Sequence, residues 1–215
     1  MAEFLLELYS EEIPPQLQIA ARSQIKQLVE NSLKEDNVKY KELSVYSSPT
    51  RLTLHIKDLN EKIKLEAKEI KGPKVGSPDQ VIQGFLRAKN VSEKDLIEKD
   101  TNKGKFYFIK IKSQSIFVED ILIKVIPKAI RSISWKKSMK WSDHDLMWGR
   151  PLRSIFAKYN NKKLPFKYEH LESKDEVIIE QDLVTKTKKI KDFKDYLSFL
   201  KSNKIIVDHN EREEI

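Results

Sequence analysis

Cysteine is absent from this 215-residue chain. Without a thiol the chain has no disulfide, no cysteine-ligated zinc and no cysteine nucleophile. No apolar run approaches the roughly 18 residues that a membrane-spanning helix needs. The opening M-A-E-F-L-L-E also lacks the basic start of a signal peptide. These absences predict a cytoplasmic protein with no membrane partner.

Glycine and histidine are scarce, with five and four copies. Residues 72–76 combine glycines with a lysine, but Pro73 removes an N–H that a phosphate cradle would need. The spacing of the four histidines supports no Ser-His-Asp arrangement. Residues 142–145, which read S-D-H-D, fit a surface loop or helix cap better than a metal site. We therefore predict no catalytic residue, no metal and no cofactor in this chain.

The charge balance is moderately basic. Lys and Arg number 41 against 33 Asp and Glu, which gives a net charge of +8. Such an excess permits a polyanionic partner without requiring one. Hydrophobic residues make up 39% and charged residues 34%, which is typical of a folded chain with an ionic surface.

All three tryptophans lie within residues 134–157, which read S-W-K-K-S-M-K-W-S-D-H-D-L-M-W-G-R-P-L-R-S-I-F-A. An indole ring offers a stacking face to a base or a guanidinium, and neighbouring cations neutralise phosphate. Alternatively, the tryptophans anchor the core and the lysines form a solvated face. The candidates for contact with RNA or with another subunit are Lys136, Lys137, Lys140 and Trp141.

Three arginines next to prolines extend these candidates. Arg51 follows Pro49-Thr50, whereas Arg150 and Arg153 flank Pro151. The planar guanidinium suits phosphate or carboxylate. Arg153 falls in an apolar strand, so it either pairs with an acid or faces a surface or cleft. An internal ion pair and a contact with nucleic acid or a subunit are both open.

The hydrophobic patterns predict an α+β fold, with a mixed, mostly antiparallel sheet packed against helices. Residues 1–70 plus 114–215 form the predicted main domain, and residues 71–113 form a small inserted subdomain with a hairpin turn at residues 102–105. After that turn, Tyr107, Ile109 and Ile111 share one strand face, while Phe106, Phe108 and Lys110 share the other. Further helices are predicted to follow Pro15 and to cover residues 117–133 and 193–200.

Four ordered segments carry a family resemblance. They read F-L-L-E-L-Y-S-E-E-I-P-P at 4–15, Y-S-S-P-T-R-L at 46–52, K-G-P and G-F-L-R at 71–73 and 84–87, and K-S-M-K-W-S-D with W-G-R-P-L-R-S-I-F-A at 137–143 and 148–157. This series resembles the β subunit of the bacterial, two-subunit-type glycyl-tRNA synthetase. The family's β chain is much longer, so the resemblance is to its N-terminal part.

The resemblance implies a glycine–tRNA ligase that acts as an αβ complex. In that family the α subunit activates glycine with ATP and Mg, and the β subunit supplies most of the tRNA binding. We therefore expect this chain to be inactive alone. The partners implied are the glycyl-tRNA synthetase α subunit and glycine-specific tRNA, and a contact between two β subunits is a further option.

The chain departs from the family pattern at one place. After the strand near residue 168 the family has a G-H-R-F-like loop, whereas residues 171–190 read L-E-S-K-D-E-V-I-I-E-Q-D-L-V-T-K-T-K-K-I. The role of that loop is therefore in doubt here. Two other functions stay open: a stand-alone RNA-binding module and a purely structural assembly domain.

Overall fold

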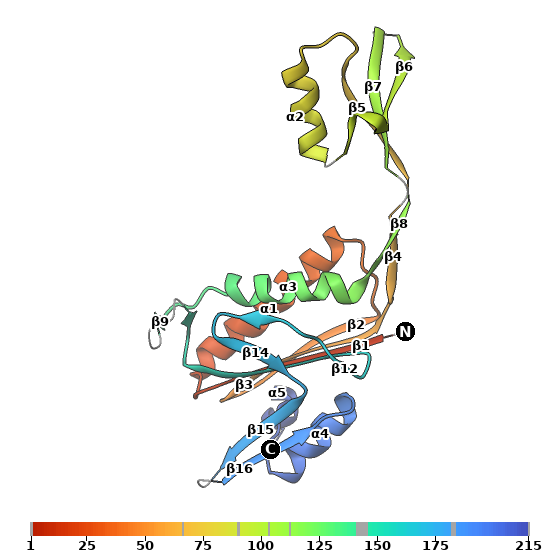
Figure 1. Ribbon diagram of the computed structural model, residues 1–215. Helices are drawn as coiled ribbons and strands as arrows, with labels where there is room; N and C mark the ends of the chain where they lie inside the picture. Colours follow the sequence, from red (N-terminus) through yellow and green to blue (C-terminus); the bar gives the residue numbers. More distant parts are fainter. Residues whose placement is uncertain are drawn as a thin grey trace. The chain divides into compact units, whose positions relative to one another are not determined.

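The computed structural model describes residues 2–65, 67–89, 91–102, 104–111, 113–140, 146–181 and 184–214. It divides into two compact units, residues 1–63 with 117–215 and residues 64–116 (Figure 1). The two boundaries fall within β4 (Lys62–Leu65) and at the end of β8 (Gln114–Phe117), which pair with each other. Within the described ranges, no helix is both long and apolar enough to cross a membrane.

The first unit is built on one large sheet, whose strand order is β13-β14-β11-β1-β3-β2, with β12 also paired to β11. Its pairings are antiparallel, except that β11 and β14 run parallel. The mixed, mostly antiparallel α+β prediction is confirmed. The strands are β1 (Ala2–Ser10), β2 (Glu42–Ser48), β3 (Arg51–Leu59), β11 (Leu152–Tyr159), β12 (Lys162–Lys163), β13 (Lys167–Tyr168) and β14 (Leu171–Lys174).

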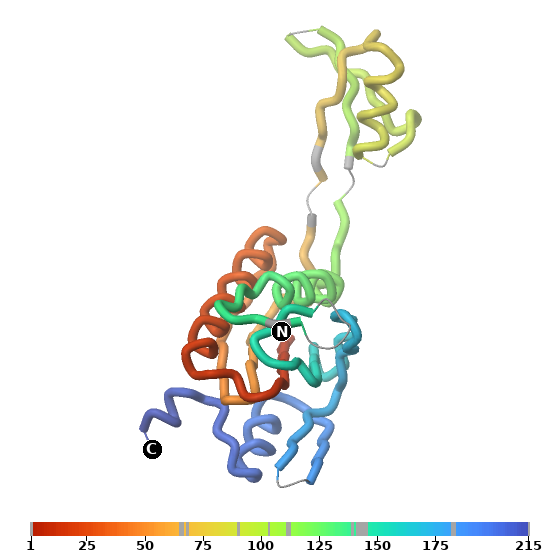
Figure 2. Tube along the Cα trace, turned by 90° about the vertical axis from the view of Figure 1, so that its left-hand side faces the viewer, coloured from red at the N-terminus to blue at the C-terminus, as the bar shows by residue number. Residues whose placement is uncertain are grey.

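Strand β1 lies in the middle of this sheet and is covered on both faces. Almost every one of its residues is buried, which explains why its sequence does not alternate between apolar and polar. On one face, α1 (Pro15–Glu35) and α3 (Val118–Ser132) pack side by side (Figures 1 and 2). The other face meets α4 (Phe193–Ser202), α5 (His209–Glu213) and the hairpin of β15 (Glu176–Gln181) and β16 (Val184–Lys189).

Local sequence explains where these helices begin. Pro14 and Pro15 start α1 at positions whose N–H groups would lack a helical partner anyway. The Asp192 carboxylate accepts a hydrogen bond from the Asp195 N–H at the start of α4. Pro127 lies inside α3, which continues through it to Ser132. Glu11 and Glu12 precede α1, whose first turn contains no acidic residue.

The second unit pairs a three-stranded antiparallel sheet, ordered β5-β7-β6, with one helix. Strand β5 continues through Gly72 and Pro73. A register shift between Lys71 and Lys74 accommodates a proline that cannot donate to the ladder. The predicted domain boundary at residue 71 would therefore cut β5. The elements are β5 (Lys68–Lys74), α2 (Asp79–Lys89), η1 (Glu93–Asp95), β6 (Leu96–Thr101) and β7 (Gly104–Ile111).

Candidate nucleic-acid or subunit interface

Three chain segments that are distant in sequence meet where β1 ends. The Ser10 N–H donates to the Thr50 carbonyl (2.9 Å) and the Glu11 N–H to the Pro151 carbonyl (3.0 Å). The Ile13 N–H donates to the Pro49 carbonyl (2.6 Å). We call this region the β1 corner; it comprises residues 11–15, 49–51 and 148–153. Three of the sequence segments singled out above are thus brought together.

An open depression of about 610 Å³ lies at the β1 corner. Arg150 is exposed there, and its Nε donates to the Glu12 carbonyl (3.1 Å). Gln18 is buried beneath and donates to the Ile13 carbonyl (2.7 Å). The side chain of Arg150 is therefore held at the rim with its charge facing solvent. The lining residues are Glu11, Glu12, Ile13, Pro14, Pro15, Gln18, Pro49 and Arg150.

Arg51 is directed into the protein, although the sequence made it a contact candidate. It is 1% exposed, and its Nη1 lies 2.8 Å from an oxygen of Glu7, which is equally buried. Its Nη2 donates to the Ile178 carbonyl (2.6 Å), and its guanidinium lies over the Tyr9 ring. Burial lowers the pKa of Arg51, but the Glu7 carboxylate, together with Tyr196 and Tyr9, raises it above its usual value. Arg51 therefore stabilises the core, and contact with RNA or a partner is corrected to an internal ion pair.

The Glu7 carboxylate also accepts a hydrogen bond from the hydroxyl of Tyr196 on α4 (2.6 Å). The same hydroxyl lies 2.8 Å from Thr53 Oγ1. Burial raises the pKa of Tyr196 well above 10.0, and the Glu7 charge adds to this effect. Tyr196 therefore stays protonated as a donor. This network connects β1, β3 and α4 across one face of the sheet.

Arg153 lies at the surface beside the β1 corner. Its Nη1 is 3.0 Å from the Glu11 carboxylate and 2.7 Å from that of Glu180, and its side chain is 45% exposed. Arg153 is therefore ion-paired, as one of the two alternatives predicted, and its accessibility keeps a contact with nucleic acid or a subunit as a prediction. The pairs are partly solvated and contribute little to stability.

Two of the tryptophans serve mainly as packing groups. Trp148 is fully buried, and Trp135 packs against it with ring centroids 4.8 Å apart. Gly149 permits this contact, since a Cβ there would come within 2.6 Å of the Trp135 ring. A buried ring offers no stacking face to a base, so Trp148 follows the core-anchor alternative. Trp141, together with Ser142–Asp145, lies outside the described residues.

The lysines of residues 134–157 that the structure describes are exposed, and hydrogen bonds connect the start of this segment to α1. The Gln24 side chain on α1 donates to the Ser134 carbonyl (2.9 Å) and accepts from the Ser134 N–H (2.8 Å). Strands β9 (Met139–Lys140) and β10 (Met147–Trp148) then pair, with Lys140 opposite the exposed Met147. We call the exposed group the β9–β10 patch; it consists of Lys136, Lys137, Lys140 and Met147.

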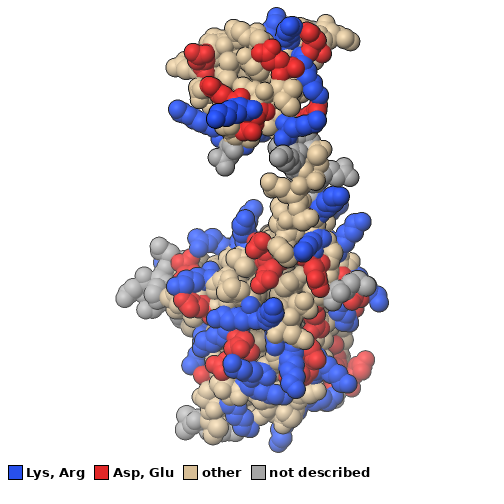
Figure 3. Space-filling model, turned by 45° about the vertical axis from the view of Figure 1, so that its right-hand side comes forward, with Lys and Arg blue, Asp and Glu red and all other residues tan. Residues whose placement is uncertain are grey.

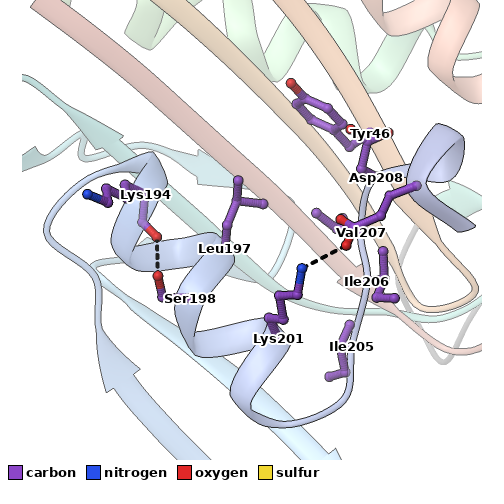
Figure 4. A pocket seen from close by; sticks show the side chains of 10 residues that line it. Tyr46, Lys194, Leu197, Ser198, Lys201, Ile205, Ile206, Val207 and Asp208 are labelled. Atoms are coloured by element: carbon purple, nitrogen blue, oxygen red, sulfur yellow. Dashed lines mark hydrogen bonds and ion pairs between the residues drawn. The ribbon is translucent and has the colours of Figure 1, made fainter.

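A smaller, more enclosed pocket of about 230 Å³ lies between β2, α4 and the segment leading into α5 (Figure 4). Tyr46, Leu197 and Val207 supply part of its apolar lining. The Lys201 ammonium at its edge is 2.8 Å from the Glu211 carboxylate. Its volume is below the range typical of ligand sites. The described side chains around it present no paired nucleophile and base.

Sequence reasoning missed Glu7 and Tyr196, which complete the buried network around Arg51. Glu7 stands among apolar residues in F-L-L-E-L-Y, and a lone acid in a buried strand is a signal for an internal cation. Tyr196 carries no such signal, because its partner lies 189 residues away.

Comparison with known proteins adds the decisive observation. The family model described as glycyl-tRNA synthetase beta subunit matches residues 4–215. The chain belongs to the glycyl-tRNA synthetase beta subunit family. It is 36% identical over 217 aligned residues to the glycine–tRNA ligase beta subunit of Rickettsia typhi and 34% identical to that of Rickettsia felis. The alignments cover 100% of this chain and 32% of each relative, in the relative's N-terminal part.

This beta-subunit chain thus spans about a third of the length of the curated relatives that it matches. The segment that departs from the family pattern, residues 171–190, covers β14, β15 and β16. The turn between β13 and β14 lies just before it. Glu169 at that turn has φ of 53°, a conformation that costs glycine less than other residues. Its carboxylate is 2.6 Å from Arg131 on α3.

Proposed function

We propose that this chain is the N-terminal region of a glycine–tRNA ligase β subunit that helps to bind and position glycine-specific tRNA and to assemble with the catalytic α subunit. The match of this whole chain to the N-terminal third of glycine–tRNA ligase beta subunits carries this proposal. In this scheme the α subunit binds ATP and Mg and activates glycine, and the chain described here supplies contacts and no reacting group. A contact between two β subunits belongs to the same assembly.

The exposed cations of the first unit are the proposed contacts. The β9–β10 patch presents Lys136, Lys137 and Lys140, and Arg150 projects at the β1 corner. On the face drawn in Figure 3, Lys and Arg are mixed with Asp and Glu, so this face carries no continuous basic surface. Local cation clusters, rather than a single basic face, are therefore the places to test for phosphate contact.

The chain offers a matched pair of variants for this test. Lys136→Glu with Lys137→Glu reverses two neighbouring charges in the patch, and Lys162→Glu with Lys163→Glu makes the same change in β12, where both lysines are also exposed. We expect the first pair to weaken binding of glycine-specific tRNA at least tenfold, because two phosphate contacts become repulsive. The second pair changes only the net charge and is expected to have a smaller effect.

Binding is measured by fluorescence anisotropy with labelled tRNA at two salt concentrations. Equal loss of affinity in both double variants would show that net charge alone matters and would exclude the patch. No RNA affinity in the parent chain, together with capture of the α subunit, would favour the structural assembly domain. If the chain binds RNA but neither prefers glycine-specific tRNA nor captures the α subunit, the stand-alone RNA-binding module is favoured.

A further inference from the structure

Among the described residues of the second unit, a helix covers one face of the sheet and none covers the other. The covered face carries Ile70 of β5, Ile109 of β7 and Leu96 of β6, which are cross-strand partners. Helix α2 packs there, since Leu86 is buried and a Cβ on Gly72 would come within 2.7 Å of the Phe85 ring. Because strand side chains alternate, the next set of residues lies on the opposite face. That face is the open face.

The open face presents two aromatic rings in the middle strand. Phe106 and Phe108 both lie on β7 and are half-buried, as expected for side chains on an uncovered sheet. Phe108 is flanked by Lys71 of β5 and by Ile97 of β6, which is 41% exposed. Two neighbouring rings on the middle strand of a sheet form a platform on which successive bases can stack.

Lysines surround these rings on both sides. Lys71 Nζ lies 3.5 Å from the centroid of Phe106, and Lys99 Nζ lies 5.6 Å from that of Phe108. The cross-strand partners of Phe106 are Lys74 and Lys99. Each ring thus has a lysine ammonium over one of its faces, as in a cation–π contact.

The charge on the open face is predominantly positive. Glu69 is the acid on it and pairs with Lys99 (2.6 Å) and more distantly with Lys110 (3.9 Å). Lys71 and Lys74 are exposed, and no ion pair with an acid is recorded for either among the described residues. Protein-binding surfaces are depleted of lysine at their centres, whereas phosphate binding requires cations. The composition therefore fits a polyanion with exposed aromatic groups.

We propose that the open face of β5, β7 and β6 binds an unpaired segment of RNA, with bases stacked on Phe106 and Phe108 and phosphates near Lys71 and Lys74. A duplex cannot use the rings, since its bases are already stacked on one another. A base displaces the flexible Lys71 side chain from the Phe106 ring, and the ammonium then neutralises an adjacent phosphate. This proposal deepens the proposed function. It rests on that function for the identity of the natural RNA, which is glycine-specific tRNA.

The test uses the 215-residue chain and a labelled single-stranded RNA of mixed sequence, with a duplex of equal length for comparison. Phe106→Leu and Phe108→Leu each remove a ring and keep an apolar side chain. Phe117→Leu is the control, because Phe117 is a surface phenylalanine that also has a lysine over its ring, with Nζ 4.5 Å from the centroid. We expect roughly tenfold weaker single-strand binding for each of the first two variants, and little change for the control.

A variant of an exposed residue tests the same face with little effect on folding. Lys71→Gln removes one charge from an exposed side chain and should lower the slope of log affinity against log salt by about one unit or slightly less. Far-ultraviolet circular dichroism of all variants checks that the sheet is intact. Unchanged RNA affinity in both phenylalanine variants, or equal binding of single strand and duplex, would overturn the proposal.

Two outcomes separate this proposal from the broader one. If Lys136→Glu with Lys137→Glu weakens tRNA binding and the phenylalanine variants do not, only the proposal for the open face fails. If the phenylalanine variants lose single-strand binding but the chain neither prefers glycine tRNA nor captures the α subunit, the open face stands and the ligase role fails. If the phenylalanine variants no longer capture the α subunit but bind RNA as the parent does, the open face is a protein contact and the proposal is overturned.

Discussion

Arg51 and Glu7 form an ion pair inside the central sheet, with 2.8 Å between Nη1 and a carboxylate oxygen and side chains that are 1% and 2% exposed. They lie on neighbouring strands, β3 and β1, and Glu7 also accepts a hydrogen bond from Tyr196. A charge buried this deeply lowers the stability of the folded protein unless its oppositely charged partner is present. The pair therefore belongs to the framework that holds α4 against the sheet.

Removing one member of this pair should be far more damaging than removing both. We expect Glu7→Gln to lower the free energy of unfolding by about 3–5 kcal/mol, because the buried Arg51 charge loses its counterion. The double variant Glu7→Leu with Arg51→Met should lose much less, since no buried charge remains. Urea denaturation of both variants measures the difference. A double variant as unstable as the single one would contradict this assignment.

Alkaline pH should destabilise the protein through its buried tyrosines. Burial raises the pKa of Tyr159 to about 12, and burial with the Glu7 charge raises that of Tyr196 well above 10.0. The unfolded chain releases these protons near pH 10, so above that pH the folded state holds more protons than the unfolded state. The stabilisation is complete below about pH 10 and is lost as pH rises through the folded-state pKa values.

Urea midpoints from about pH 9 to 11.5, in the range set by the ordinary tyrosine pKa, measure this decline. Tyr196→Phe should be less stable at neutral pH by about 1.5–3 kcal/mol, because it removes the donor to a charged oxygen. It should also show a shallower alkaline decline than the parent. An equally steep decline in Tyr196→Phe would assign the effect to other groups.

The contact between Trp135 and Trp148 depends on the absence of a side chain at residue 149. We expect Gly149→Ala to cost about 1–3 kcal/mol and to shift tryptophan emission to the red, because the new Cβ displaces the Trp135 ring. Gly84→Ala in α2 is the control. Nothing lies within 4 Å of its added Cβ, so it should stabilise by about 0.5–1 kcal/mol. Unchanged emission in Gly149→Ala would refute the contact.

Much of the fold follows from local sequence patterns. The structure confirms the helices predicted after Pro15 and over residues 117–133 and 193–200, and the apolar strand that contains Arg153. Each of these segments has a clear apolar pattern. Strands β14 and β16 were not predicted. β16 reads V-T-K-T-K-K and is mostly exposed, so no apolar pattern marks it, and its pairing with β15 defines it.

The sequence predicts which residue types gather at the candidate site, but not which of their side chains are exposed. The exposure of Lys136 and Lys137 follows from their charge, but the burial of Arg51 depends on Glu7, which lies 44 positions earlier in the chain. The sequence places Trp148 among cations, and only the packing of Trp135 across Gly149 shows that its ring is enclosed. Contacts between residues that are distant in sequence thus decide whether a candidate side chain is buried or exposed.

The chain alone should not activate glycine. We expect no glycine-dependent exchange of pyrophosphate into ATP above the background of a heat-denatured sample, because the described residues offer no phosphate cradle and no acid–base pair. Addition of the α subunit is expected to restore aminoacylation only with the full-length β chain. Exchange by this chain alone, repeated after removal of any contaminating α subunit, would contradict the proposed division of labour.

The most direct test of the proposed function is a titration of this chain with glycine-specific tRNA and with a second tRNA of different specificity. Anisotropy is recorded at low and at near-physiological salt. The account predicts saturable binding that weakens with salt and favours glycine-specific tRNA. Absence of binding, or equal affinity for both tRNAs at both salt concentrations, would contradict it.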